Sequence, residues 1–115
     1  MRTKLFAVRG AVSVDENTAE AIRTASVGLY RAVLEKNSFT DIVSVQISMT
    51  EDLTAAYPAK FIREDGCTAP LFSSREPSVD NALPLCIRLL ITAYGSGEAR
   101  HVYQGKAAAL RPDIK

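Results

Sequence analysis

Apolar and polar residues alternate along residues 43–49, and this period of two predicts a half-buried strand. Strand-forming residues also dominate residues 4–12, where Arg9-Gly10 predicts a break, and residues 85–94, the most apolar stretch of the chain. Two shorter strands are predicted at residues 69–74 and 101–103. The pattern therefore predicts a sheet of about five strands, with residues 85–94 at its centre.

A helical period predicts one long helix. From Thr18 to residue 33, apolar residues recur every three or four positions. Asn17, followed three residues later by Glu20, predicts the N-cap, and Asn37 predicts a left-handed stop. These signals bound the helix at both ends.

The remaining segments complete an α+β prediction. Residues 51–65 are expected to form short helical turns interrupted by Pro58, residues 75–84 a loop, residues 95–98 a turn, and the tail after residue 110 irregular structure. Residues 1–115 are expected to form a single domain. Strands that do not alternate regularly with helices favour a mixed sheet with the long helix on one face. One helix covers only part of such a sheet, so we expect oligomerisation to cover the rest.

Composition and charge exclude several classes of function. The formal net charge of +1 gives no general attraction to nucleic acid or to anionic lipid. No segment is predicted to cross a membrane, and no export signal is found at the N-terminus. Cys67 and Cys86 do not form a disulfide framework, which favours reduced thiols and a cytoplasmic location.

Residues for metal, cofactor or covalent chemistry are scarce. His101 is the only histidine, and the two cysteines are not at metal-ligand spacing. No glycine-rich phosphate loop is present, and a Ser or Cys nucleophile would lack its usual base. We therefore expect neither a metal nor a cofactor.

Cations stand at unexpected places in the sequence. Arg88 lies within the apolar central strand, where burying it without a partner would cost several kcal/mol. Arg9 is a lone cation in a second apolar strand, Lys60 and Arg63 share one helical face, and Arg111 precedes a proline. Because arginine binds carboxylates through two parallel hydrogen bonds, this set suits a small ligand with more than one carboxylate.

Structural roles are open for the same residues. Arg88 could form an ion pair with Glu76 or Asp80, and Arg9 could be a strand-end residue beside a glycine bulge. Solvated surface charge is the structural alternative for Lys60, Arg63 and Arg111. Glu76 could be a surface loop residue and Tyr103 an edge-strand aromatic, and the structural role of His101 and Cys86 would be packing.

Six short motifs closely resemble the AroH-class chorismate mutases, and the resemblance runs over nearly the whole chain. They are, in chain order, Val8-Arg9-Gly10-Ala11, Asp52-Leu53-Thr54-Ala55, Tyr57-Pro58-Ala59-Lys60, Cys86-Ile87-Arg88, Arg100-His101-Val102-Tyr103 and Leu110-Arg111-Pro112-Asp113. Each motif is weak alone, but their order and spacing are specific. The resemblance implies a cofactor-free rearrangement of chorismate to prephenate, in phenylalanine and tyrosine biosynthesis, by a homotrimeric pseudo-barrel with sites between subunits.

The resemblance also implies a role for each site residue. Arg88 would contact the breaking ether oxygen and one carboxylate, Glu76 the ring hydroxyl, and Arg9 with Tyr103 the side-chain carboxylate. The implied additional contacts are Tyr57, Ala59, Lys60 and Arg63 from the adjacent subunit, Phe72 and Ser73 in the pocket wall, and Leu110 with Arg111 in a closing tail. Because negative charge grows on the ether oxygen as the C–O bond breaks, a fixed cation there would stabilise the transition state.

Two other functions are compatible with these residues. A small trimeric imine/enamine deaminase shares a similar architecture and uses an arginine for the substrate carboxylate. A non-catalytic trimeric module that binds a dicarboxylate would use the same cations without turnover. The order of Glu76, Arg88 and Tyr103 favours the mutase, although Ser73 stands where that family often has cysteine or another small residue.

Overall fold

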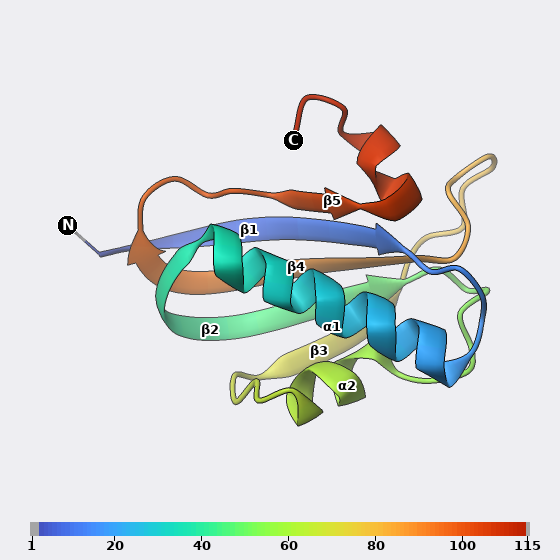
Figure 1. The fold of residues 1–115 in the computed structure, drawn as a ribbon, viewed down its shortest axis with the longest axis horizontal. Helices are drawn as coiled ribbons and strands as arrows, with labels where there is room; N and C mark the ends of the chain where they lie inside the picture. The colour runs from blue at the N-terminus through green and yellow to red at the C-terminus, as the bar shows by residue number, and fades with distance from the viewer. Residues whose placement is uncertain (1–2, 115) are drawn as a thin grey trace.

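The computed structural model describes residues 3–114, and its centre is a five-stranded mixed sheet in the order β3-β2-β4-β1-β5 (Figure 1). The strands are β1 (Lys4–Ser13), β2 (Ser38–Met49), β3 (Leu71–Arg75), β4 (Cys86–Ser96) and β5 (Val102–Gln104). The central strand β4 is antiparallel to β1 and β2, whereas the two edge strands are parallel to their neighbours. The predicted α+β class and the central place of this strand are confirmed.

One face of the sheet is covered by α1 (Ala19–Lys36), as Figure 1 shows. The side chains of Ile22, Leu29 and Val33 on this helix are fully buried. The predicted break at Gly10 is wrong, because β1 continues through it and pairs with β4 without a register shift. A Cβ at Gly10 would lie 3.1 Å from Cδ1 of Leu29, so the glycine lets α1 approach the sheet closely.

Both predicted ends of α1 need correction. The N-cap is Thr18, whose hydroxyl accepts the N–H of Ala21, whereas Asn17 accepts backbone N–H groups of the segment around Thr54. Asn37 is extended, with φ −127°, and its side-chain amide donates to the carbonyls of Val33 and Arg100. The asparagine therefore ends the helix with side-chain hydrogen bonds and not with a left-handed backbone.

A short helix, α2 (Pro58–Glu64), contacts α1 and the edge strand β3 (Figure 1). The prediction that Pro58 interrupts helical turns is wrong, because this proline occupies the first turn of α2. Proline lacks an N–H group, and the first helical N–H has no partner within the helix, so proline is well tolerated there. Phe61 and Ile62 point into the core below α1.

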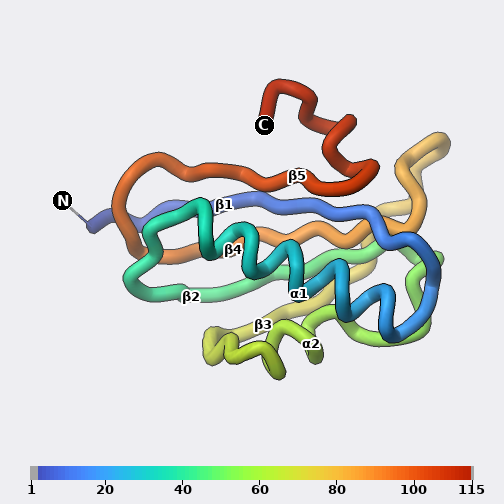
Figure 2. The backbone as a smooth tube through the Cα atoms, in the orientation of Figure 1, coloured from blue at the N-terminus to red at the C-terminus, as the bar shows by residue number. Residues whose placement is uncertain are grey.

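The opposite face, which we call the open face, is covered only at one end within residues 3–114. There the 3-10 helix η1 (Gly105–Leu110) places Ala107 against Ala11 and Cys86. Figure 2 shows the chain passing from β4 through a wide arc back to β5, beside β1, before it turns into η1. Exposed apolar side chains of the strands include Leu5, Phe72 and Tyr94.

Candidate active site

A row of side chains crosses the whole open face. The strand registers pair Ser74 with Ser48, Ser48 with Arg88, Arg88 with Ala11, and Ala11 with Tyr103. Directly paired residues point to the same face of a sheet, so these five positions form one line across all the strands. Ala11 is buried beneath Ala107 of η1, so η1 covers the sheet between Arg88 and Tyr103.

A second row lies beside the first and brings in the other strand arginine. Phe72 pairs with Gln46, Gln46 with Leu90, and Leu90 with Arg9. Residues of both rows surround a hollow of about 350 Å³, the sheet hollow, lined by Arg9, Gln46, Ile47, Ser48, Phe72, Ser74, Arg88, Leu89 and Leu90. Two cations in one hollow suit a ligand that carries more than one negative charge.

Arg88 is less buried than its apolar strand suggested, since 44% of its side chain is exposed on the open face. The expected ion pair with Glu76 is present, with 3.4 Å between Arg88 Nε and Glu76 Oε1. The pairing does not fill the space beside the guanidinium, because Arg88 also lines the sheet hollow. Arg88 therefore forms the ion pair with Glu76 and also lines the sheet hollow.

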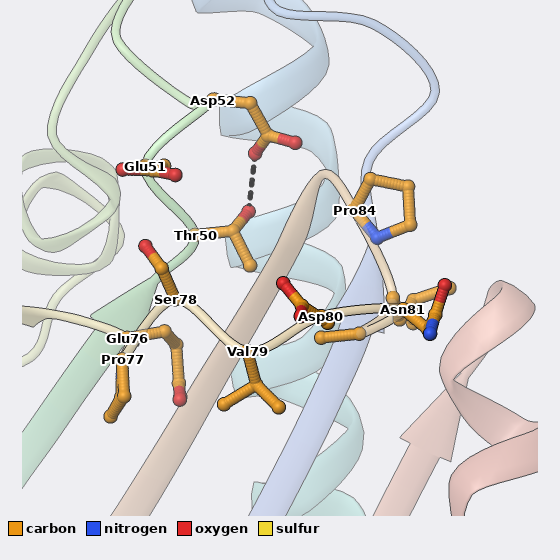
Figure 3. A pocket seen from close by; sticks show the side chains of 12 residues that line it. Thr50, Glu51, Asp52, Glu76, Pro77, Ser78, Val79, Asp80, Asn81 and Pro84 are labelled. Carbon is orange, nitrogen blue, oxygen red and sulfur yellow. Dashed lines mark hydrogen bonds between the residues drawn. The ribbon is translucent and has the colours of Figure 1, made fainter.

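Glu76 is fixed at the point where β3 ends and the loop of residues 76–85 begins. Its N–H donates to the carbonyl of Met49 at 2.8 Å, and its carboxylate accepts a hydrogen bond from Ser48 Oγ. The loop encloses a second hollow of about 360 Å³ with acidic walls at Glu51, Asp52 and Asp80. Figure 3 shows this hollow, with the Glu76 side chain directed away from Thr50 and Asp52. Its acidic walls do not suit an anionic ligand.

The far end of the loop is held by Asp52. Leu85 has a φ of 48°, which is uncommon for a residue with a large side chain. Its N–H donates to Asp52 Oδ2 at 3.0 Å, and the next N–H, of Cys86, donates to Thr50 Oγ1 at 3.0 Å. Hydrogen bonds at both ends of the loop therefore fix Glu76 and the start of β4 relative to β2.

The C-terminal segment brings another cation to the open face. The Arg111 guanidinium lies 6.0 Å from the ring centroid of Tyr103, and its Nη2 forms an ion pair with Asp113 at 2.9 Å. His101 accepts the backbone N–H of Arg9 at Nδ1, 3.0 Å away. Burial, together with the charges of Arg9 and Arg111, lowers the pKa of His101, so the neutral form that accepts this hydrogen bond is favoured.

The residues of α2 are not brought to the sheet hollow. Lys60 and Arg63 are exposed on α2, and Tyr57, 69% exposed, immediately precedes it. Ala59 is half-buried on the same helix. Within one chain these four candidates are separate from Arg9 and Arg88, since none of them lines the sheet hollow.

The β3 candidates divide between the two faces of the sheet. Phe72 lines the sheet hollow. Ser73 pairs with Ile47 and belongs to the opposite face of the sheet, so it is Ser74, not Ser73, that lines the hollow. Leu110, the last residue of η1, is 39% exposed.

The sequence did not predict three polar residues that line the sheet hollow, namely Ser48, Gln46 and Ser74. In the sequence they are ordinary polar positions of alternating strands.

Both cysteines are free and buried. Cys86 lies on the open face below η1, two residues before Arg88. Burial raises the pKa of its thiol, and the nearby Arg88 only partly offsets this effect. The neutral thiol is therefore a packing group, in agreement with the structural role expected for Cys86.

The fold and the site define an α+β protein that presents fixed cations and one carboxylate on an open sheet face. The family described as chorismate mutase type I matches residues 5–114. The curated "Chorismate mutase AroH" of Thermus thermophilus is 41% identical, with 94% of each chain covered. The protein of the same name from Bacillus subtilis is 35% identical, covering 93% of this chain and 90% of its own.

A solved structure agrees with these relatives. A chorismate mutase from Clostridium thermocellum superimposes with a TM-score of 0.85 at 33% identity, over 90% of this chain and 98% of its own. The chain belongs to the chorismate mutase type I family. This family membership favours mutase activity over the deaminase and the non-catalytic binding module.

Proposed function

We propose that this chain catalyses the rearrangement of chorismate to prephenate in aromatic amino acid biosynthesis, without a cofactor. Family membership supports the activity, and the pair of arginines in the sheet hollow is the observation that carries the mechanism. In this reaction one C–O bond breaks and one C–C bond forms within the same molecule. No proton, electron or leaving group is exchanged, so a site without a general base is sufficient.

Arg88 is the central catalytic residue of the proposed mechanism. The ether oxygen gains negative charge in the transition state, and a guanidinium held by the central strand is already placed to meet it. Its Nε is engaged by Glu76 at 3.4 Å, and it lines the sheet hollow with Arg9. Because arginine stays protonated, this stabilisation persists over the physiological pH range.

The substrate is held in its reactive shape by Glu76, Arg9, Tyr103 and Arg111. Glu76 accepts the ring hydroxyl, while Arg9 and Tyr103 bind the side-chain carboxylate. Such contacts restrict a flexible dianion to the compact conformer that rearranges, which is an orientation effect. The position of Tyr103 on the same row as Arg88, with only Ala11 between them, supports this division of labour.

The complete site is proposed to form between the subunits of a homotrimer. Each subunit is proposed to be a single domain over residues 1–115, of which residues 1–2 and 115 lie outside the described part. The open face carries Leu5, Phe72 and Tyr94 exposed. The neighbouring subunit would add Tyr57, Ala59, Lys60 and Arg63, and the tail with Leu110 and Arg111 would close over the site. A partner is needed because α2 does not reach the sheet hollow of its own chain.

The proposed location of the protein is the cytoplasm. Both thiols are free, which suits a reducing compartment such as the cytoplasm. No helix within residues 3–114 has the length and apolar character needed to cross a membrane.

A chorismate depletion assay tests this function. The purified chain is expected to remove the ultraviolet absorbance of chorismate and to form prephenate in equal amount, with no added metal or cofactor. Binding of chorismate without turnover would support the dicarboxylate-binding module instead. Turnover of 2-aminoacrylate with no effect on chorismate would support the deaminase.

A further inference from the structure

Ser48 is the hydrogen-bond donor found for the Glu76 carboxylate within residues 3–114. It belongs to β2 and stands directly opposite Arg88 in the β2–β4 register. Its Oγ donates to Glu76 Oε1, the same oxygen that lies 3.4 Å from Arg88 Nε. One carboxylate oxygen is therefore shared between a hydroxyl and a guanidinium, which leaves Oε2 for a further donor.

We propose that Ser48 is a positioning residue that holds Glu76 in the orientation needed to accept the substrate hydroxyl. The inference rests on the proposed function and goes beyond it by adding a residue that acts through Glu76. Glu76 begins a loop, and the carbonyl of Met49 accepts its backbone N–H at 2.8 Å. This backbone hydrogen bond does not by itself choose among the staggered rotamers that a glutamate side chain can adopt. Ser48 selects one of them from a rigid strand.

The competing rotamer would harm catalysis. An unrestrained carboxylate beside a guanidinium favours the bidentate ion pair, in which both oxygens face the cation. Glu76 would then cover Arg88 and neutralise the charge that the ether oxygen needs. By engaging Oε1, Ser48 keeps the contact with Arg88 to one edge of the carboxylate.

Burial makes this contact more influential than a surface hydrogen bond. The Glu76 side chain is only 20% exposed, and Ser48 is half-buried and lines the sheet hollow. Hydrogen bonds to charged groups are stronger than those between neutral groups, and they strengthen further as water is excluded.

The test compares Ser48→Ala with Ser48→Thr, which keeps the hydroxyl and suits a strand. A lost hydrogen bond to a charged group predicts that S48A lowers kcat/KM by about tenfold to a hundredfold, whereas S48T retains most of the activity. Ser44→Ala is the matched control, since Ser44 lies on the same strand opposite Thr92. It is expected to change kcat/KM less than about twofold.

A double-mutant cycle with Glu76→Gln separates positioning from direct substrate contact. S48A is expected to cost little further activity in the E76Q background, because Ser48 acts through the carboxylate. An equal loss in both backgrounds, or equal losses in S48A and S44A, overturns the proposal. If S48A does not fold, Ser48→Cys, with a similar shape and a weak donor, takes its place in the cycle. Inactive wild-type protein would instead refute the proposed function itself.

Discussion

The two faces of the sheet are made from the same strands but serve different purposes. On the α1 side, Val8, Val45 and Ile91 are fully buried and meet Leu29 and Val33 of the helix. On the open side, the positions between them hold arginine, serine, glutamine and exposed aromatic residues. Because side chains alternate along a strand, neighbouring residues point to opposite faces, so one packs in the core while the next is available to the candidate site. Substitutions on the two faces should therefore have separable effects.

The largest expected effect is that of Arg88→Ala on the open face. Loss of a preorganised charge at the transition state predicts a fall in kcat/KM of about 10²–10³-fold. The melting temperature should change little, because 44% of this side chain is exposed. Arg23→Ala, on the exposed part of α1, is the control cation and should leave kcat/KM unchanged. Full activity of R88A would refute the mechanism.

Leu29→Ala should reverse this pattern on the covered face. Leu29 is fully buried and lies over Gly10, so truncation leaves a cavity and should cost about 2–5 kcal/mol of unfolding free energy. Activity per folded molecule should stay close to that of wild type at temperatures below the transition. Urea unfolding gives the first quantity and initial rates give the second. A large loss of kcat with unchanged stability would contradict the separation of the two faces.

His101 should make stability depend on pH at the edge of the sheet. Its folded pKa lies below the ordinary value of 6.5, so the unfolded chain binds the proton more readily. The stability is fully present above pH 6.5 and is lost as the pH falls below this value, through the folded pKa. Protonation also removes the Nδ1 acceptor of the Arg9 N–H.

His101→Asn keeps an acceptor that does not titrate, so it is the matched variant for this effect. The melting temperature of wild type should drop between about pH 7 and about pH 5, and the drop should be smaller in H101N. Equal slopes in the two proteins would show that another group is responsible.

The smallest expected effect is that of Asp65→Asn, outside both faces. The Arg31 guanidinium, by its hydrogen bonds, lowers the pKa of the Asp65 carboxyl, yet Arg31 itself is 65% exposed. Exposed ion pairs contribute little and are screened by salt. The melting temperature of D65N should therefore fall slightly at low ionic strength, and the difference should vanish in concentrated salt. A large drop that persists in salt would show that this pair stabilises the packing of α1 against α2.

The sequence predicted the covered face better than the open face. Alternation along residues 43–49 and helical spacing around Leu29 follow from the burial of apolar surface, which is a local property of the sequence. Where two local signals compete, prediction failed: Pro58 starts α2, and Asn37 ends α1 through side-chain hydrogen bonds. Proline breaks helices in their interior but is favoured at their start, and position within the helix decides between these effects.

The open face depends on strand register, which the sequence does not give. Arg9 and Arg88 were identifiable because cations are unusual in apolar strands. Ser48 and Ser44 are indistinguishable in the sequence, and only the pairing of Ser48 with Arg88 distinguishes the two. The separation of Arg63 from the sheet hollow is likewise a property of the fold, and it motivates the proposed second subunit.

Mixing two defective subunits tests the shared site most directly. R88A and R63A chains carrying different affinity tags are co-expressed, and mixed assemblies are isolated by tandem purification. In a cyclic trimer containing both variants, one site receives both native arginines, so about a third of the wild-type activity should return. Activity no greater than that of the separate variants would contradict a site built from Arg88 of one chain and Arg63 of its neighbour.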